Sequence, residues 1–238
     1  MGRCHCDGPF VPPLKGQYLT MAGSASSPRY SPREEIANSV IHGVGGLLAM
    51  GGSGVLITLA TRRGDTWHIV SCAIYGTTLV LLYLSSTLYH AVTSPRAKET
   101  LRGIDHSSIF LLIAGTYTPF TLVTLRGPWG WSLLAVVWGI AALGVAFQVT
   151  LLRRRAILSV GLYIAMGWAV VVAIRPMLAA VPTEGVVLLL VGGLAYTGGV
   201  GFYVWRRLPY HHAVWHLFVL AGSACHFAAV LRSVIPSS

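Results

Sequence analysis

The sequence predicts an all-α membrane protein, a bundle of seven transmembrane helices with the N-terminus in the cytoplasm and the C-terminus outside. Three observations lead to this fold class. Hydrophobic residues make up 54% of the 238 residues, charged residues make up only 10%, and the apolar residues gather in seven long stretches. A soluble domain carries about 25% charged residues, whereas a helix that crosses a membrane needs about 20 mostly apolar residues.

Two regions are expected along the chain. Residues 1–33 are rich in Pro, Gly and Ser and predict a polar, disordered tail. Its Cys4-His5-Cys6 run lacks the C-x-x-C spacing typical of a metal site. Residues 34–238 form the transmembrane domain, and its first helix acts as the insertion signal because the tail lacks the apolar segment of a signal peptide. The expected helices are 35–60, 67–93, 103–125, 129–151, 156–174, 184–205 and 210–234.

Short connections that carry charges or helix breakers separate these stretches. Arg62-Arg63-Gly64-Asp65 ends the first helix, and Pro95-Arg96 ends the second. The later breaks are Gly127-Pro128, Arg153-Arg154-Arg155, Pro182 and Arg206-Arg207. Within the third helix, the run from Ala114 to Phe120 predicts a kink with small packing residues, since Pro119 removes a helical hydrogen bond.

The basic residues predict the orientation. Twelve of the 17 lie in the tail and in the loops on its side of the membrane, against five on the other side. Cytoplasmic loops are enriched in Lys and Arg, so the N-terminus is expected in the cytoplasm of a multi-pass protein of the cell membrane. The net charge of +10 is therefore a topology signal and does not indicate a nucleic-acid partner.

Polar residues gather at helix ends on this same, cytoplasmic side. Ser86 and His90 end the second helix, Asp105 lies near the start of the third, and His212 and His216 begin the seventh. Residues four apart share one face of a helix, so each i, i+4 pair is directed together. Ionisable residues at membrane depth are costly and mark functional sites by default.

Three histidines and a carboxylate from three helices predict a metal centre. His90, His212 and His216 are the expected ligands, and three imidazoles with one open position are typical of catalytic zinc, which lowers the pKa of a bound water to about 7. Asp105 is the expected base or orienter of that water, and Ser86 is expected to position Asp105 or the substrate. The alternative for Asp105 is a simple cap on the third helix.

The other histidines have simpler interpretations. His42 and His226 are expected to be hydrogen-bond partners between helices, as single membrane histidines usually are. His226 lies about 21 Å along the helix from His212 and cannot share a ligand shell with it. His42 lies at the depth of the cluster, so it is expected to support the ligands or, alternatively, to close the fourth metal position.

The chain resembles the hemolysin III proteins, bacterial members of the progestin and adipoQ receptor family that includes the adiponectin receptors. The resemblance covers about residues 34–234. It is carried by Glu35-Ile-Ala-Asn38 with His42, Ser86-Thr-Leu-Tyr-His90, Ile104-Asp105-His106-Ser107-Ser108-Ile109-Phe110, Ala114-Gly115-Thr116-Tyr117-Thr118-Pro119-Phe120, and His212-Ala-Val-Trp-His216 with His226.

The resemblance implies seven helices and a zinc ion in the inner leaflet, bound by His90, His212 and His216. It implies that Asp105 bonds the zinc water and that Ser86 is its neighbour. The eukaryotic relatives resemble lipid amide hydrolases, which implies a zinc-dependent hydrolase here. The role of a hormone receptor does not transfer, because the tail is short and nothing indicates a hormone-binding surface.

The predicted function is therefore a zinc-dependent hydrolase of a membrane lipid amide or ester. A first alternative is a non-enzymatic sensor or receptor-like protein, in which zinc clamps the second, third and seventh helices. A second alternative is a cytolysin, which would require a continuous polar stripe through the bilayer. The polar groups lie mainly at the inner end, with His226 as the chief exception, so this alternative ranks last.

Overall fold

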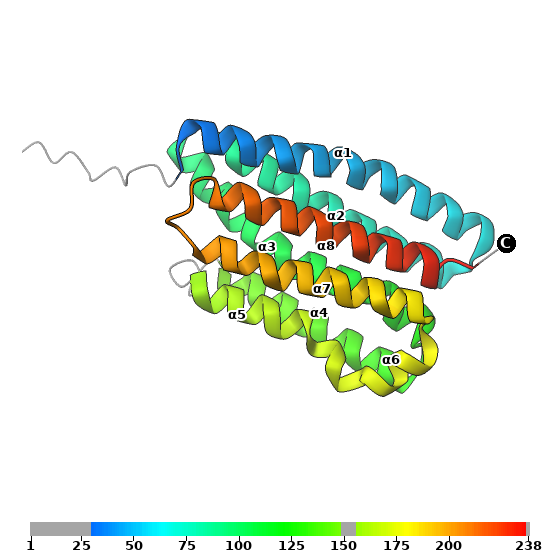
Figure 1. Ribbon diagram of the computed structural model, residues 1–238. Coiled ribbons are helices and arrows are strands. Elements are labelled where there is room, and N and C mark those ends of the chain that lie inside the picture. Colours follow the sequence, from blue (N-terminus) through cyan, green and yellow to red (C-terminus); the bar gives the residue numbers. More distant parts are fainter. Residues whose placement is uncertain (1–29, 149–155, 237–238) are drawn as a thin grey trace, which may run out of the picture.

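Seven helical spans form one bundle in the computed structural model, which describes residues 30–148 and 156–236 (Figure 1). The first two spans are α1 (Pro32–Arg63) and α2 (Thr66–Ala91). The third is α3 (Pro95–Pro119), extended by a π-helical turn, η1 (Phe120–Thr124), and the fourth is α4 (Pro128–Gln148). The fifth comprises α5 (Ala156–Gly167), the 3-10 segment η3 (Ala169–Ala173) and α6 (Ile174–Ala180). The last two are α7 (Thr183–Val204) and α8 (His211–Ser233).

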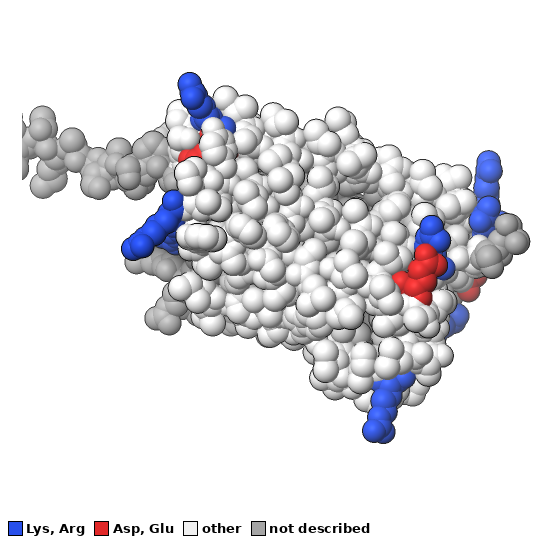
Figure 2. Space-filling view, in the orientation of Figure 1, with Lys and Arg blue, Asp and Glu red and all other residues white. Residues whose placement is uncertain are grey.

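The predicted fold class is confirmed, because all seven spans are long and apolar enough to cross a membrane. The flank of the bundle seen in Figure 2 is almost free of charged side chains, which gather at its two ends. The predicted tail up to residue 29, including Cys4-His5-Cys6, and the arginines 153–155 lie outside the described residues. Which end of the bundle faces the cytoplasm stays a prediction.

Two boundaries differ from the sequence prediction by more than three residues. The third helix begins at Pro95 rather than 103, because the charged residues after Pro95 form two helical turns that project from the apolar span. Its N-cap is Ser94, so Asp105 lies well inside the helix and the interpretation of Asp105 as a cap is wrong. The fifth span continues to Ala180 rather than 174, across the 3-10 segment.

The predicted kink region of α3 supports the break in the fifth span. The Tyr117 hydroxyl donates to the carbonyl of Gly167 at 2.7 Å and accepts the N–H of Val170 at 3.0 Å. It thereby hydrogen-bonds to backbone groups that lose their helical partners at the break in the fifth span, as a break at membrane depth requires.

Gly115 allows α3 to approach α2 closely, since a Cβ there would overlap the side chain of Thr78.

The centre of the bundle is formed by α2 and α3. In their apolar stretches 56% and 61% of the residues are buried, against 17% for both the fifth span and α7. Helix α1 packs on α2 and α8, and α7 packs on α8. The starts of α1 and α8 and the end of α2 therefore meet at one end of the bundle (Figure 1).

Helix caps fix the turns at the opposite end. Asp65 caps α2 by accepting the backbone N–H groups of Trp67 and His68. The hydrogen bond from the His68 side chain holds the pKa of Asp65 below its usual value. The short turn between α1 and α2 is thus held by the Asp65 cap, which fixes where α2 begins.

Candidate metal centre

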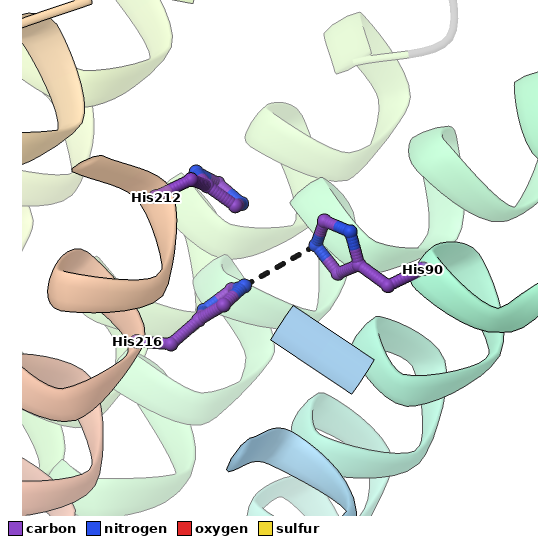
Figure 3. A group of neighbouring side chains, drawn as sticks. All are labelled: His90, His212 and His216. Atoms are coloured by element: carbon purple, nitrogen blue, oxygen red, sulfur yellow. Dashed lines mark hydrogen bonds between the residues drawn. The ribbon is translucent and has the colours of Figure 1, made fainter. Parts of the chain in front are cut away.

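Three histidines converge where α2 ends and α8 begins. His90 comes from the last turn of α2, and His212 and His216 come from the first two turns of α8 (Figure 3). One ring nitrogen from each lies within 4.8 Å of the others, and no other such group occurs in residues 30–148 and 156–236. The three residues are 3%, 7% and 3% exposed. The set proposed as metal ligands from the sequence is therefore brought together by the fold.

One pair of these nitrogens is spaced as metal ligands are. Nε2 of His90 and Nε2 of His216 lie 3.2 Å apart. Two nitrogens on one tetrahedral zinc, each at about 2.05 Å, would be separated by about 3.4 Å. Three imidazoles are also a ligand set that suits zinc. His90, His212 and His216 could therefore hold a metal ion, and their chemistry is compatible with zinc.

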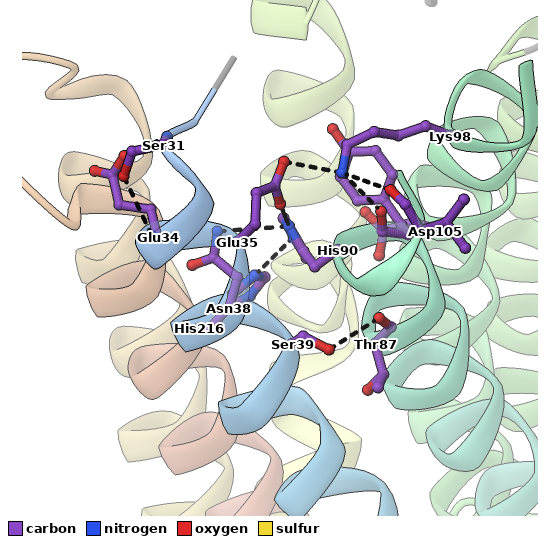
Figure 4. Close-up of polar contacts among 12 residues, drawn as sticks. Ser31, Glu34, Glu35, Asn38, Ser39, Thr87, His90, Lys98, Asp105 and His216 are labelled. Carbon is purple, nitrogen blue, oxygen red and sulfur yellow. Dashed lines mark hydrogen bonds and ion pairs between the residues drawn. The ribbon is translucent and has the colours of Figure 1, made fainter. Parts of the chain in front are cut away.

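A carboxylate orients His90. Oε2 of Glu35, at the start of α1, lies 2.6 Å from Nδ1 of His90 (Figure 4). An ionised carboxylate only accepts hydrogen bonds, so Nδ1 of His90 carries the proton and donates it. Nε2 of His90 is then left with a lone pair that faces His216. Metal-binding histidines in proteins are commonly held by a carboxylate in this way.

Lys98 completes this arrangement from α3. Its ammonium lies 2.9 Å from Oε1 of Glu35 and donates to the carbonyl of Tyr89 at 3.1 Å. Asn38, one turn deeper on α1, places its amide nitrogen 3.5 Å from Nδ1 of His90. The ion pair between Lys98 and Glu35 helps to hold the carboxylate in place, because hydrogen bonds between charged groups are stronger than those between neutral groups.

The residues just before α1 cover the cluster from its end. The ring of Tyr30 stacks on the ring of His212 with centroids 4.8 Å apart, and Tyr30 is only 6% exposed. Glu34 accepts the backbone N–H of Tyr210 at 2.9 Å, and Tyr210 has the positive φ of 56° just before α8 begins. The start of α1 therefore contacts both helices that carry the three histidines, α2 and α8.

Asp105 and Ser86 line a cavity beside the histidines. The cavity has a volume of about 450 Å³, and its wall includes His212 and His216. Asp105 is 8% exposed, and its Oδ2 lies 3.5 Å from Nδ1 of His106. Ser86 is 1% exposed, and among the described residues its hydroxyl has no hydrogen-bond partner, so it does not bond Asp105 directly. Their catalytic roles stay predictions.

The cavity extends along the bundle from the histidines to the far ends of the helices. Its deeper wall is formed mainly by apolar side chains of α3, the fifth span and α7. Four of these apolar side chains are also 40–57% exposed. They are Val171, Ile174, Leu178 and Leu190.

His226, His211 and His42 lie outside the group of converging nitrogens. Nε2 of His226 lies 3.1 Å from the carbonyl of Leu189, which confirms a hydrogen bond between α8 and α7. Nδ1 of His211 lies 3.1 Å from the carbonyl of Phe202, outside the cluster. The His42 ring lies 3.6 Å from the His216 ring, measured between centroids, yet His42 does not belong to the group of converging nitrogens.

The supporting residues Tyr30, Glu35 and Lys98 were not predicted from the sequence. A Glu in the first turn of a helix is usually explained by the helix dipole. The available signal is the spacing of Glu35, Asn38 and His42, which places all three on one face of α1. Tyr30 gave no signal, because it falls within a stretch whose composition is that of a disordered tail.

Comparisons with known proteins identify the family. Residues 30–227 match the family model described as haemolysin-III related. The chain is 46% identical over 202 residues to the hemolysin-3 homolog of Bacillus subtilis (strain 168), covering 85% of this chain and 95% of the relative. It is also 46% identical over 206 residues to hemolysin-3 of Bacillus cereus, covering 87% of this chain and 94% of the relative.

A more distant relative is the human monocyte to macrophage differentiation factor, which is 30% identical over 214 residues, covering 86% of this chain and 87% of the relative. The matched region begins at Tyr30 and includes all three histidines of the cluster. Together with the seven spans, these matches show a multi-pass membrane protein that belongs to the haemolysin-III-related family.

Proposed function

We propose that this protein is a zinc-dependent hydrolase of a lipid amide or ester, with its site in the cytoplasmic leaflet of the cell membrane. The observation that carries the proposal is the contact of the histidine cluster, through His212 and His216, with a long apolar cavity. The Asp105 carboxylate and the Ser86 hydroxyl line the wall of the same cavity. A polar group at the histidines can therefore be joined to an acyl chain along the cavity.

The histidines supply the metal's ligands, and the chain provides the other groups that hydrolysis needs. A zinc ion in such a site polarises an acyl carbonyl and makes water more acidic. The Asp105 carboxylate accepts the proton of the attacking water and later returns it to the leaving nitrogen or oxygen. Ser86 donates a hydrogen bond to the bound acyl group and orients it. Glu35 keeps Nε2 of His90 available by holding the proton on Nδ1.

The exposed apolar residues of the cavity wall support a substrate that comes from the membrane. Val171, Ile174 and Leu178 from the fifth span and Leu190 from α7 line the cavity and are also exposed. Acyl chains enter between such apolar side chains without passing through water. A lipid substrate also accounts for a hydrolytic site placed at membrane depth, where polar groups are costly.

The sensor alternative is supported by the position of the centre, since a metal bound there would join α2 to α8 and, through Glu35, to α1. Lipid turnover separates the two proposals, because a purely structural centre leaves lipids intact. A pore is less well supported, because the described residues of the cavity wall are mostly apolar and form no continuous polar stripe like that of a channel. The name hemolysin belongs to the relatives.

The first test is the metal content of the purified protein, measured by elemental analysis in wild type and in the double variant His212→Ala/His216→Ala. We expect about one zinc per chain in wild type, and its loss in the double variant. His226→Gln is the matched control, since it removes a histidine from the same helix outside the cluster, and it should keep the metal. Wild type without metal would end the hydrolase proposal.

The second test is hydrolysis of N-acyl and ester lipids in nanodiscs. Wild type loaded with zinc should release fatty acid, and the double variant should release none. Zinc binding without any release of fatty acid would leave the sensor proposal as the better one.

A further inference from the structure

His42 is a buried histidine with no hydrogen-bond partner. It is 3% exposed, and within residues 30–148 and 156–236 neither of its ring nitrogens makes a hydrogen bond. Buried polar groups in folded proteins are nearly always paired, and an exception calls for an explanation. His42 also lines the cavity beside the histidine cluster, so a cavity ligand can reach it.

The ring of His42 is held in place by its neighbours. The centroid of His216 lies 3.6 Å from it, and the ring of Tyr83 meets it edge-on at 5.1 Å. His42 lies seven residues after Glu35 on α1, about 10.5 Å deeper along the helix axis. It therefore adjoins the predicted zinc ligands on the side of the cavity, away from the Glu35 carboxylate that serves His90.

Ser86 is a second buried polar group without a partner, and it lines the same cavity from α2. The hydroxyls on either side of it are paired within their own helix. Ser85 donates to the carbonyl of Leu82 at 3.0 Å, and Thr87 donates to the carbonyl of Tyr83 at 2.7 Å. The hydroxyl of a helical serine commonly donates a hydrogen bond to a carbonyl of the preceding turn. The hydroxyl of Ser86 makes no such bond among the described residues, so it is available to a ligand.

The charges around the cavity indicate what kind of head group it takes. No Lys or Arg occurs among the described residues that line it, and the Asp105 carboxylate is part of its wall. No Lys or Arg of the described wall would balance an anionic head beside Asp105, and in the proposed function the metal is engaged by the acyl carbonyl and the water. A neutral imidazole has one N–H donor and one acceptor nitrogen, which suits a neutral group that both donates and accepts.

We infer that His42 and Ser86 form a subsite that binds the neutral polar head of a lipid in the cavity, through a hydroxyl or amide that both donates and accepts hydrogen bonds. His42 is then a specificity-determining residue, which discriminates such a head from one that only accepts. The inference rests on the proposed function, because it requires that the cavity takes a lipid. It does not require that the lipid is hydrolysed.

The test compares two probes that are not substrates, dodecanol and dodecyl methyl ether. Both have the same alkyl chain, but only the alcohol donates a hydrogen bond. Binding is measured in nanodiscs by the rise in the unfolding temperature with probe concentration, since a ligand of the folded state stabilises it. The variants are His42→Phe, which removes both nitrogens, and His42→Asn, which keeps a donor and an acceptor. Zinc content is measured in each variant.

We expect wild type to bind dodecanol about tenfold more tightly than the ether, as one well-placed hydrogen bond allows. His42→Phe should lose this preference while it keeps zinc, and His42→Asn should restore part of it. Ser86→Ala should also weaken the preference, whereas Ser85→Ala, the matched control on the same helix, should not.

An unchanged preference for the alcohol in His42→Phe would overturn the inference while the proposed hydrolase stands. If neither probe stabilises wild type, the cavity does not take lipids. The inference and the proposed function would then both fail.

Discussion

Oε2 of Glu35 lies 2.6 Å from Nδ1 of His90, and Oε1 of the same carboxylate lies 2.9 Å from the ammonium of Lys98. One side chain near the start of α1 therefore links the end of α2 to the start of α3 beside the histidine cluster (Figure 4). Because the carboxylate accepts the proton on Nδ1, it determines which nitrogen of His90 is available to a metal.

The first prediction is that Glu35→Gln weakens zinc binding. Glutamine still offers an oxygen, but it has no charge, and it makes His90 a poorer ligand. We expect the affinity for zinc to fall by about 10- to 100-fold, which is the usual effect of removing such a supporting partner. Competition with a chromogenic chelator measures it.

Glu184→Gln is the control for this variant, because Glu184 pairs with Arg232 at 2.9 Å, away from the cluster. Its affinity for zinc should equal that of wild type. Equal affinities in all three proteins would show that Glu35 does not support the metal.

The second prediction concerns Asp105. Asp105→Asn should keep about one zinc per chain, because Asp105 is not among the converging ligands. It should lower the rate of lipid hydrolysis by about 10²- to 10⁴-fold, as expected for a lost general base. Elemental analysis and fatty-acid release measure the two effects on the same sample. Full activity in Asp105→Asn would remove Asp105 from the chemistry.

The number of spans and the convergence of the three histidines were predictable because both depend on local sequence. Long apolar stretches define the spans, and an i, i+4 pair such as His212 and His216 faces one way on any helix. Alternation of the chain across the membrane then places His90 at the same end. None of these steps needs knowledge of how the side chains pack.

The supporting contacts could not be predicted, because they depend on packing between helices that are distant in sequence. Glu35 and Lys98 meet only because α1 and α3 both lie against the end of α2. The true start of α3 was missed for a related reason. Charged residues at 96–102 resemble a loop in an apolar sequence, yet they continue the helix beyond the apolar span.

The third prediction is that Gly115→Ala destabilises the protein. A Cβ at residue 115 would overlap the side chain of Thr78, which is buried between α2 and α3. Overpacking of this kind costs about 1–3 kcal/mol. Gly139→Ala is the control, since a Cβ there meets no atom of the described residues within 4 Å, and alanine favours a helix.

Thermal unfolding in detergent should give a lower midpoint for Gly115→Ala and an unchanged or higher midpoint for Gly139→Ala. Equal midpoints for the two variants would mean that α2 and α3 can move apart without cost.

The fourth prediction concerns Tyr30, whose ring stacks on that of His212 and also lies 6.0 Å from the ring of His90. The ring covers the cluster at the end of the bundle, so it should slow the escape of a bound metal into water. Tyr30→Ala should release zinc to an excess of chelator about tenfold faster than wild type, since removal of an aromatic contact costs about 0.5–1.5 kcal/mol beyond its area. Tyr30→Phe keeps the stacked ring and should release zinc nearly as slowly as wild type.

The rates separate this covering role from a role in stability. If Tyr30→Ala only loosens the fold, its unfolding temperature falls and zinc release follows unfolding. If Tyr30 covers the centre, zinc release is faster at temperatures where the fold remains intact. Equal release rates in wild type and Tyr30→Ala would show that the metal leaves by another route, through the cavity and past the Asp105 carboxylate.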